Sequence, residues 1–426
     1  MRRFLHNITI FSVFLIFLPS LGNAAQLTLE SCLKQASERN LLLRSVRWEK
    51  SIAREQLNQT DSLMFPRVDL QGGYTMQAEA QAMKVNNQVL DMQQGSYAFA
   101  NIAVNQTIYD FGRRDARRNQ ARSASEAAGF IIRDHEQDIS LQVIEAFFGL
   151  LEAEKLVLAA EEEQRTVQEH RRVVQVLFET GVVTRNDLLQ ADVRQASARQ
   201  KLLYQKNRNL NIRLQLNFLI GATVEEKDTL VEPPVSSLEL VTKDFSTAET
   251  DNRPDLNAIR KQIEVNEQEV RESRTLFYPE LFARFSMDYL QNDKVREQAI
   301  YAGTVGLKIN LFDGFASTAI REKAVSVRSK NMEQLRFAEE KARIEILTAR
   351  NDAKVAKERI AVTAEAINQG EENLRINQNR YQERVGTATE VLDAQTLLTQ
   401  ARTEHYRAYY DYQVASARVR RAVGKL

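Results

Sequence analysis

Two kinds of hydrophobic periodicity alternate along this chain. Apolar residues recur at every second position from about 67 to 76 and again from about 96 to 109, which predicts two β-strands with one apolar and one polar face. Helical spacing follows the short sequence Asp110-Phe111-Gly112 and continues without proline as far as Gly181. The pattern therefore predicts a helix of about 68 residues and roughly 100 Å, at 1.5 Å per residue.

The second half of the chain repeats this order of elements. Alternation at about 280–290 and about 300–312 predicts two more strands, and a second long helix runs from Ala316 to Tyr381. Phe65-Pro66 and Tyr278-Pro279 precede the first strand of each half at an offset of 213 residues (66 to 279). The second strands end at an offset of 203 residues (110 to 313). A period near 205 residues indicates an internal duplication rather than a solenoid.

Each long helix ends in a short turn, at about 180–184 and about 384–388, and leads into a shorter partner helix. Gly181 suits the left-handed backbone that ends a helix. The partner helix in the first half carries an apolar residue at every seventh position, which predicts a coiled-coil seam against the long helix. These residues are Leu189, Ala196, Leu203 and Leu210.

The domain organisation follows from these landmarks. Residues 1–24 have a basic start, an apolar segment and the small-residue site Gly22-Asn23-Ala24, which is typical of a secretory signal peptide. We expect a first repeat at 25–221, a linker at 222–250 and a second repeat at 251–426. The fold class is mainly α, with duplicated strand–strand–long-helix units.

Four strands with one apolar face indicate a membrane β-barrel shared between chains, because an open sheet edge is not tolerated in a bilayer. Three copies supply twelve strands, and small inward residues such as Gly73 and Gly306 are expected to leave room for a passage. The long helices would continue this barrel as a periplasmic coiled-coil α-barrel. Polar alternation in the second half predicts a set of barrel-lumen residues: Arg284, Asp288, Lys308 and Asn310.

Composition and motifs exclude several other functions. Charged residues make up 27% of the chain, but basic and acidic residues balance and no basic block stands out, so nucleic-acid binding has no support. The sequence has no nucleophile elbow, phosphate loop or zinc motif, so we expect neither an enzyme nor a cofactor. The single cysteine, Cys32, is expected to be a small buried hydrophobic residue.

The order of motifs resembles the TolC family of outer-membrane efflux proteins over essentially the whole mature chain. The resemblance lies in their occurrence twice at matching distances rather than in any single one. The segments are LTLESCLKQASERN, FPRVDLQGGY, YDFGRRDARRNQAR, FETGVVTRNDLLQADVRQASA, NRPDL, YPELFARFSMDY, VGLKINLFDG and RYQERVGTATEVLDAQTLLTQA.

The resemblance implies an outer-membrane location and a homotrimer with a 12-stranded barrel in lipid and a long periplasmic portion. It also implies docking to a periplasmic adaptor, also called a membrane fusion protein, and through it to an inner-membrane transporter of RND or ABC type. The implied function is a passive exit duct for a tripartite efflux or type I secretion system. The alternative is a periplasmic structural coiled-coil protein without channel activity.

The resemblance also implies roles for residues near the two turns. In this family a tyrosine on one coiled coil and an aspartate on its neighbour hold the periplasmic gate closed, and Tyr381 and Asp187 match that pair. Two acidic residues past the second turn line the constriction, and Glu390 and Asp393 match them. An ordinary solvated helix face is the alternative interpretation of this acidic pair.

The turns themselves match the tips that meet the adaptor in this family. Two departures stand in the second tip: Gly386 replaces an arginine that supports the closed gate in some members, and Arg384 replaces the usual tip glycine. The adaptor-docking residues implied by the resemblance are Gly181, Val182, Val183, Thr184, Val385, Gly386 and Thr387.

Overall fold

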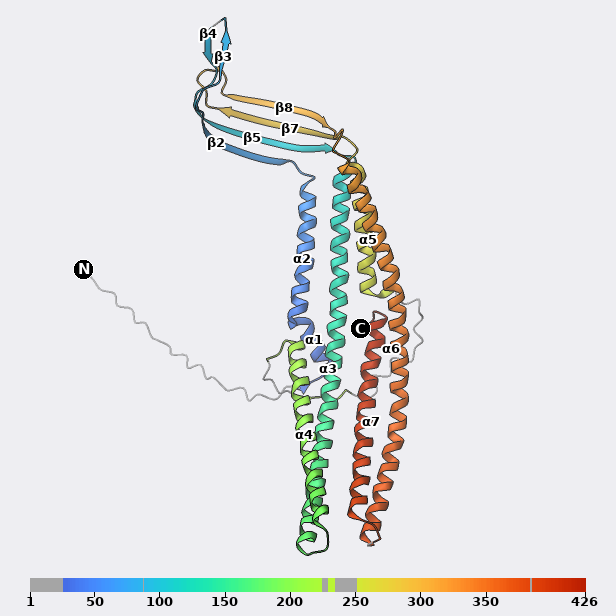
Figure 1. The fold of residues 1–426 in the computed structure, drawn as a ribbon. Coiled ribbons are helices and arrows are strands. Elements are labelled where there is room, and N and C mark those ends of the chain that lie inside the picture. The colour runs from blue at the N-terminus through green and yellow to red at the C-terminus, as the bar shows by residue number, and fades with distance from the viewer. Residues whose placement is uncertain (1–25, 87, 224–228, 234–250, 384) are drawn as a thin grey trace, which may run out of the picture.

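The computed structural model describes residues 26–86, 88–223, 229–233, 251–383 and 385–426. The expected signal peptide at 1–24 and most of the expected linker lie outside these residues. The protein is long and narrow, with a curved sheet at one end and two helical turns at the other (Figure 1). No helix in the described ranges is long and apolar enough to span a membrane.

The sheet contains four antiparallel strands in the order β2-β5-β7-β8, so the two repeats meet between β5 and β7. The first three strands have the bounds that the alternation predicts. The four are β2 (Arg67–Met76), β5 (Ser96–Tyr109), β7 (Glu280–Leu290) and β8 (Ala299–Lys308).

The register gives the sheet one apolar and one polar face. Leu70 lies opposite Ile102, which lies opposite Met287, and this row continues to Tyr301. Successive side chains in a strand point to opposite faces, so alternate positions of all four strands build a common apolar surface. It carries the following large side chains: Val68, Leu70, Tyr74, Met76, Ile102, Val104, Leu281, Phe285, Met287, Tyr289, Tyr301, Val305 and Leu307.

The prediction that the last strand reaches residue 312 is wrong. The β7–β8 ladder ends at the pair Glu280–Lys308, because Pro279 precedes Glu280 and has no N–H to donate. Asn310 therefore lies beyond β8, and its side-chain amide donates to the Asp313 carboxylate at 3.0 Å. That contact assigns Asn310 to the turn before the helix rather than to a strand.

The helices form two antiparallel pairs of equal design, α3 with α4 and α6 with α7, while α2 and α5 flank their upper halves (Figure 1). Both long helices have 67 residues. The bounds are α1 (Leu29–Arg39), α2 (Leu41–Ser62), α3 (Arg113–Glu179), α4 (Arg185–Ile220), α5 (Pro254–Thr275), α6 (Ala316–Gln382) and α7 (Ala388–Ala422).

The chain changes from strand to helix through the same backbone arrangement in both repeats. Two consecutive residues adopt left-handed backbone, Phe111-Gly112 in the first repeat and Gly314-Phe315 in the second. The preceding aspartate then caps the helix: Asp110 accepts from the amide of Arg114 at 3.1 Å, and Asp313 accepts from the amide of Ser317 at 3.0 Å. A sharp bend followed by a cap turns the chain from the sheet into the helix.

The largest hydrophobic core lies where α1, α3, α4 and α7 meet. Phe147 and Tyr410 are almost fully buried there, and the Tyr410 hydroxyl donates to Glu232 at 3.1 Å. Cys32 is also fully buried in this core, as the sequence predicts. The end of α4 and the beginning of α2 both pack into this core.

Two small sheets are absent from the sequence-based expectation. A hairpin of β3 (Ala82–Val85) and β4 (Gln88–Asp91) projects from the segment between β2 and β5 (Figure 1). A parallel pair joins β1 (Gln26–Leu27) to β6 (Thr229–Leu230). Both are too short for periodicity to reveal them.

The predicted heptad seam of α4 is also wrong. Leu189 is 52% exposed and Leu203 is 62% exposed, whereas Ala191 and Ala198 are buried against α3. Both stripes repeat every seven residues, and the smaller side chains allow α3 and α4 to approach closely. The leucine stripe is therefore left uncovered in a single chain.

Candidate functional site

The two helical turns have the same backbone hydrogen bonds. In the first, the amides of Val182 and Val183 donate to the Leu177 carbonyl at 2.8 and 3.4 Å. In the second, the amides of Val385 and Gly386 donate to the Arg380 carbonyl at 2.9 and 3.0 Å. Gly181 adopts the predicted left-handed conformation, with φ of 75°. Residue 384, its counterpart in the second turn, lies outside the described residues.

A capping box starts the helix after each turn. Thr184 accepts from the amide of Asp187 at 3.3 Å, and the Asp187 carboxylate accepts in return from the amide of Thr184 at 2.8 Å. Thr387 and Glu390 make the same pair of bonds, at 3.2 and 2.8 Å. Two of the predicted gate residues, Asp187 and Glu390, therefore also hold the first turn of α4 and α7.

The capping contact changes the titration of Asp187. The Thr184 hydroxyl donates to the carboxylate at 2.7 Å, and together with the Thr184 amide it holds the pKa of that carboxyl below its usual value. Because the pKa is lowered in the folded state, the cap contributes stability above the ordinary carboxyl pKa. This contribution is lost as the pH falls through the lowered pKa.

Replacing Thr184 with alanine is expected to loosen the start of α4 locally. Loss of an N-cap side chain raises the opening of the first helical turn by about fivefold. Hydrogen exchange followed by mass spectrometry should show faster exchange near residues 185–190 and unchanged exchange near 388–393. Thr387→Ala is the matched control, with the reverse pattern, and equal exchange at both turns in either variant would contradict the capping role.

The two acidic gate residues, Glu390 and Asp393, each lie near an arginine on another helix. Asp393 accepts from Arg194 at 3.4 Å, which links α7 to α4 across the two coiled coils. Arg380 lies 3.8 Å from Glu390. Both acidic residues are therefore near a guanidinium group. Tyr381 is 43% exposed and makes no hydrogen bond to Asp187 within the described part of the chain.

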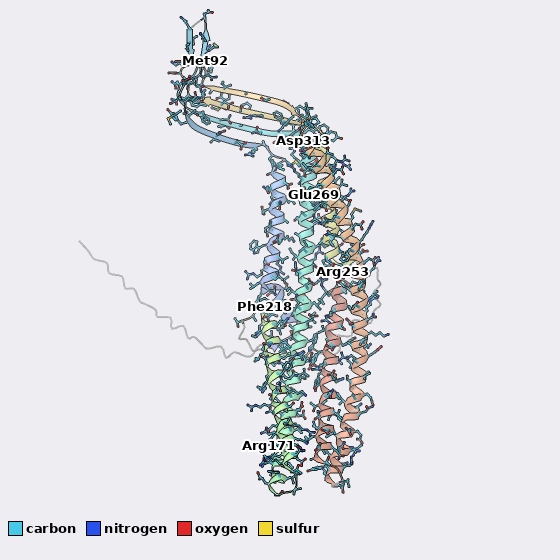
Figure 2. All side chains as sticks on the ribbon, in the orientation of Figure 1. Met92, Arg171, Phe218, Arg253, Glu269 and Asp313 are labelled. Carbon is cyan, nitrogen blue, oxygen red and sulfur yellow. The ribbon has the colours of Figure 1, made fainter. Side chains whose placement is uncertain are left out.

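An ion pair also ties α3 to α4 near the first turn, where Arg171 is labelled in Figure 2. Its guanidinium Nε donates to Asp192 at 2.9 Å. In each antiparallel pair, α3 with α4 and α6 with α7, buried small residues pack between the two helices. Side-chain contacts join the helices near the turn. The two turns lie side by side at the lower end of the molecule (Figure 1).

The predicted lumen residues share the polar face of the sheet. Arg284 lies opposite Asn105 and Thr304, and Asp288 lies opposite Asn101, whose amide donates to it. Lys308 stands on the same face at the end of the ladder. Asn310 is the exception described above, because it is not on a strand.

The expected role of the two inward glycines is wrong. A Cβ on Gly73 would lie 2.7 Å from Cε1 of Phe99, and one on Gly306 would lie 2.6 Å from Cζ of Phe282. The aromatic ring of the adjacent strand thus occupies the space above each glycine. Any larger residue at these positions would collide with the ring, and the glycines themselves leave no open space.

The sheet has an apolar outer face, a polar inner face and two edges that no strand of the described residues covers, and it stands on paired long helices. These features define an outer-membrane channel subunit. Comparison with known proteins confirms this class. Residues 32–222 and 247–425 match the family described as outer membrane efflux protein. The chain belongs to this family, whose members are outer-membrane transport proteins rather than enzymes.

One curated relative is the alkaline protease secretion protein AprF of Pseudomonas aeruginosa, 23% identical over 305 residues. The match covers 69% of this chain and 63% of AprF, so the chain spans just under two thirds of that relative's length.

Solved channel structures share the fold over 93% of this chain. The outer membrane protein VceC of Vibrio cholerae is 19% identical, with a TM-score of 0.78 over 96% of its chain. The outer membrane channel CmeC of Campylobacter jejuni is 16% identical, with a TM-score of 0.82 over 85%. The channel MtrE of Neisseria gonorrhoeae, solved in its open state, is 17% identical, with a TM-score of 0.78 over 88%.

Proposed function

We propose that three copies of this chain form a passive exit duct through the outer membrane. The observation that carries this proposal is the two-faced sheet with free edges at β2 and β8. Four strands cannot close a barrel, and two chains give eight strands, a number whose interior side chains fill. Twelve strands from three copies enclose a wider lumen lined by the polar face, including Arg284, Asp288 and Lys308.

The uncovered leucine stripe of α4 supports the same assembly below the membrane. Leu189, Leu203 and Leu210 are each more than half exposed in one chain. A seam with heptad spacing is suited to pack against a helix of another copy. The three pairs of coiled coils would then close into an α-barrel that continues the duct through the periplasm.

The two turns would form the entrance and the docking tips. Exposed Val182 and Val385, at 68% and 70%, offer apolar contacts to a periplasmic adaptor protein, which would connect the duct to an inner-membrane transporter of RND or ABC type. Asp187 and Tyr381 would hold the entrance shut between neighbouring copies. Glu390 and Asp393 would line it, with their charge partly offset by Arg380 and Arg194.

Two kinds of cargo are compatible with the proposed duct. AprF is described as an alkaline protease secretion protein, and CmeC and MtrE as outer membrane channels. Secretion of a polypeptide and efflux of small molecules both suit a wide polar duct. Transport would need no catalytic residue or cofactor, because an inner-membrane partner would supply the energy.

Cell fractionation is expected to recover the protein in the outer membrane as a trimer that dissociates only on heating in detergent. Purified trimers should then conduct ions in planar bilayers. A soluble, monomeric protein in the periplasmic fraction would contradict the proposed duct and favour the alternative, a periplasmic structural coiled-coil protein. A membrane-bound trimer that conducts no ions even in a variant without the gate contact would contradict the channel activity but not the trimeric assembly.

A further inference from the structure

The two outer edges of the main sheet are uncovered in one chain. Among the described residues, no strand pairs with the free side of β2 or of β8. The proposed function requires β8 of one copy to meet β2 of the next, and the inference below rests on that assembly.

The duplication is preserved in the hydrogen-bonding register. Arg67 pairs with Asn105 in the first repeat. Shifting each by its repeat offset, 213 for the first strand and 203 for the second, gives the pair Glu280–Lys308, which is observed in the second repeat. The same shift relates the other β2–β5 pairs to β7–β8 pairs, for example Leu70–Ile102 to Ala283–Val305. The two repeats thus have equivalent pairing.

Within one chain, the second strand of the first repeat (β5) pairs with the first strand of the second repeat (β7). Between copies, the second strand of the second repeat (β8) would pair in the same way with the first strand of the neighbour's first repeat (β2). Ala103 pairs with Ser286 inside the chain. The repeat offsets convert this pair into Gly306 opposite Gly73 of the neighbouring copy.

We propose that neighbouring copies join through β8 and β2 in this register, with Gly306 facing the neighbour's Gly73 on the lumen side. The consequence is an aromatic contact across the subunit boundary. Phe282 lies over Gly306 and Phe99 lies over Gly73, each within one chain. Once the two glycines are adjacent, the two rings lie over neighbouring strands that are about 4.8 Å apart.

That separation is suitable for an aromatic pair, whose ring centres prefer to be about 4.5–7 Å apart. The two glycines have no Cβ, so both rings can extend over them and meet offset-stacked or edge to face. In a single chain each Phe–Gly pair only covers a glycine near a free edge. In the assembly, three such aromatic pairs would bridge the three subunit boundaries.

The other residues in this register are also compatible. Asn105 opposite Arg284 becomes Lys308 opposite Gln71, so an amide again faces a cation. Asn101 opposite Asp288 becomes Thr304 opposite Thr75, and threonine pairs are favourable across strands. On the lipid side, small residues meet large ones: Leu307 faces Gly72, and Gly303 faces Met76 of the neighbouring copy.

A register displaced by two residues is the main rival. It would place Lys308 opposite Asp69 of the neighbour, which makes an ion pair between strands. However, it would also set Gly306 against Gln71, so the two rings would no longer meet over paired glycines. Both registers keep polar residues on the lumen side, and an experiment must distinguish them.

Cysteine pairs distinguish the two registers in the full-length trimer, in a Cys32→Ala background. Lys308→Cys with Gln71→Cys, and Thr304→Cys with Thr75→Cys, are in the proposed register. Lys308→Cys with Asp69→Cys and Ala302→Cys with Thr75→Cys are the matched controls, both in the rival register displaced by two residues. After mild oxidation in the membrane, the first two variants should give covalent trimers on non-reducing gels, and the controls several-fold less.

Preferred cross-linking of the displaced pairs would overturn the register. An amine-reactive cross-linker applied to the same membranes separates this failure from failure of the proposed function. Trimers seen with that reagent but not with the in-register cysteines would reject the register alone. Monomers with both reagents would reject the shared barrel as well.

A double-mutant cycle tests the aromatic contact. Phe99→Leu and Phe282→Leu are each expected to lower the temperature at which the trimer dissociates in detergent. If the rings meet between copies, the double variant should lose clearly less than the sum of the two single shifts, because each single change already removes the contact. Additive shifts would mean that each ring covers only its own glycine, and would overturn the contact.

Discussion

Channels built from the Tyr381→Phe, Asp187→Ala double variant are expected to show several-fold higher single-channel conductance than the unaltered protein. The proposed gate contact joins these residues between neighbouring copies, so a trimer contains three of them. A hydrogen bond contributes about 1 kcal/mol net. Losing three would shift the closed–open equilibrium by roughly a hundredfold, at tenfold per 1.4 kcal/mol. Planar-bilayer recording at fixed salt measures this directly.

The capping role of Asp187 requires a control for this experiment. Its carboxylate also accepts from Thr184, so Asp187→Ala loosens the start of α4 as well as any gate contact. Thr184→Ala removes the capping hydroxyl and keeps the carboxylate, and it should leave conductance close to that of the unaltered protein. Equal conductance in the double variant and the unaltered protein would reject this pair as the gate. High conductance in Thr184→Ala would assign the effect to the cap.

The strands were predictable because one face of each is apolar along its whole length. Alternation at Val68, Leu70 and Tyr74 can only arise from an extended segment with two different environments. The end of β8 was not predictable from β8 itself. Alternation continues through Ile309 and Leu311, but the ladder stops where Pro279, on the partner strand, cannot donate. A strand end depends on its neighbour as well as on its own sequence.

The helices show a related limit. Periodicity correctly identified the long helices and their turns, yet it selected the wrong stripe of α4 for the seam within the chain. Leu189 and Ala191 belong to two stripes with the same seven-residue spacing, and one chain buries only the second. The spacing of apolar residues along the sequence shows which residues share a face of the helix. Which face packs against the neighbouring helix depends on the size of the side chains that meet there. The leucine stripe is a sensible prediction for the assembly and a wrong one for the single chain.

Contacts between distant residues were the hardest to predict. Arg194 and Asp393 lie in different repeats, and nothing in either local sequence brings them together. The glycine at position 73 was assigned to the correct face, but its purpose depends on Phe99, which lies on the next strand. The family resemblance therefore suggested the gate residues and the alternation suggested the lumen residues, and both remain predictions. The contacts around these residues depend on the strand register and on the helix pairing.

Arg253→Ala is expected to destabilise the protein more than any other single change discussed. The Arg253 side chain is only 6% exposed. Its guanidinium donates to Asp255 at 2.7 and 3.0 Å and to the Ala422 carbonyl at 3.0 Å, and it lies 2.9 Å from Glu345. It thereby ties the start of α5 to α6 and to the end of α7, at mid-length in Figure 2.

Removing the buried guanidinium leaves the Ala422 carbonyl without its donor, and it leaves Asp255 and Glu345, which are 30% and 40% exposed, without their counter-charge. Losing such a partner costs about 1–3 kcal/mol. Unfolding of the detergent-solubilised protein in urea, followed by circular dichroism, is the measurement. Arg260→Ala is the matched control: Arg260 also joins α5 to α6, through Glu339 at 3.1 Å, but it is 33% exposed. It should cost only about 0–1 kcal/mol. Equal losses in the two variants would contradict the importance of burial.

The loss in Arg253→Ala should also depend on pH. Burial raises the pKa of the Asp255 carboxyl, but the hydrogen bonds and charge of Arg253 outweigh burial and hold that pKa below its usual value. The pair therefore contributes stability above the ordinary carboxyl pKa and loses it as the pH falls through the lowered pKa. Without Arg253, burial is opposed by the Leu256 amide and the Arg421 charge but no longer by the Arg253 guanidinium, so Asp255 takes up a proton at higher pH. The difference in unfolding free energy between the two proteins should therefore be largest near neutral pH and shrink below about pH 4. A difference that stays constant down to pH 3 would assign the loss to the Ala422 carbonyl and to packing instead of the ion pair.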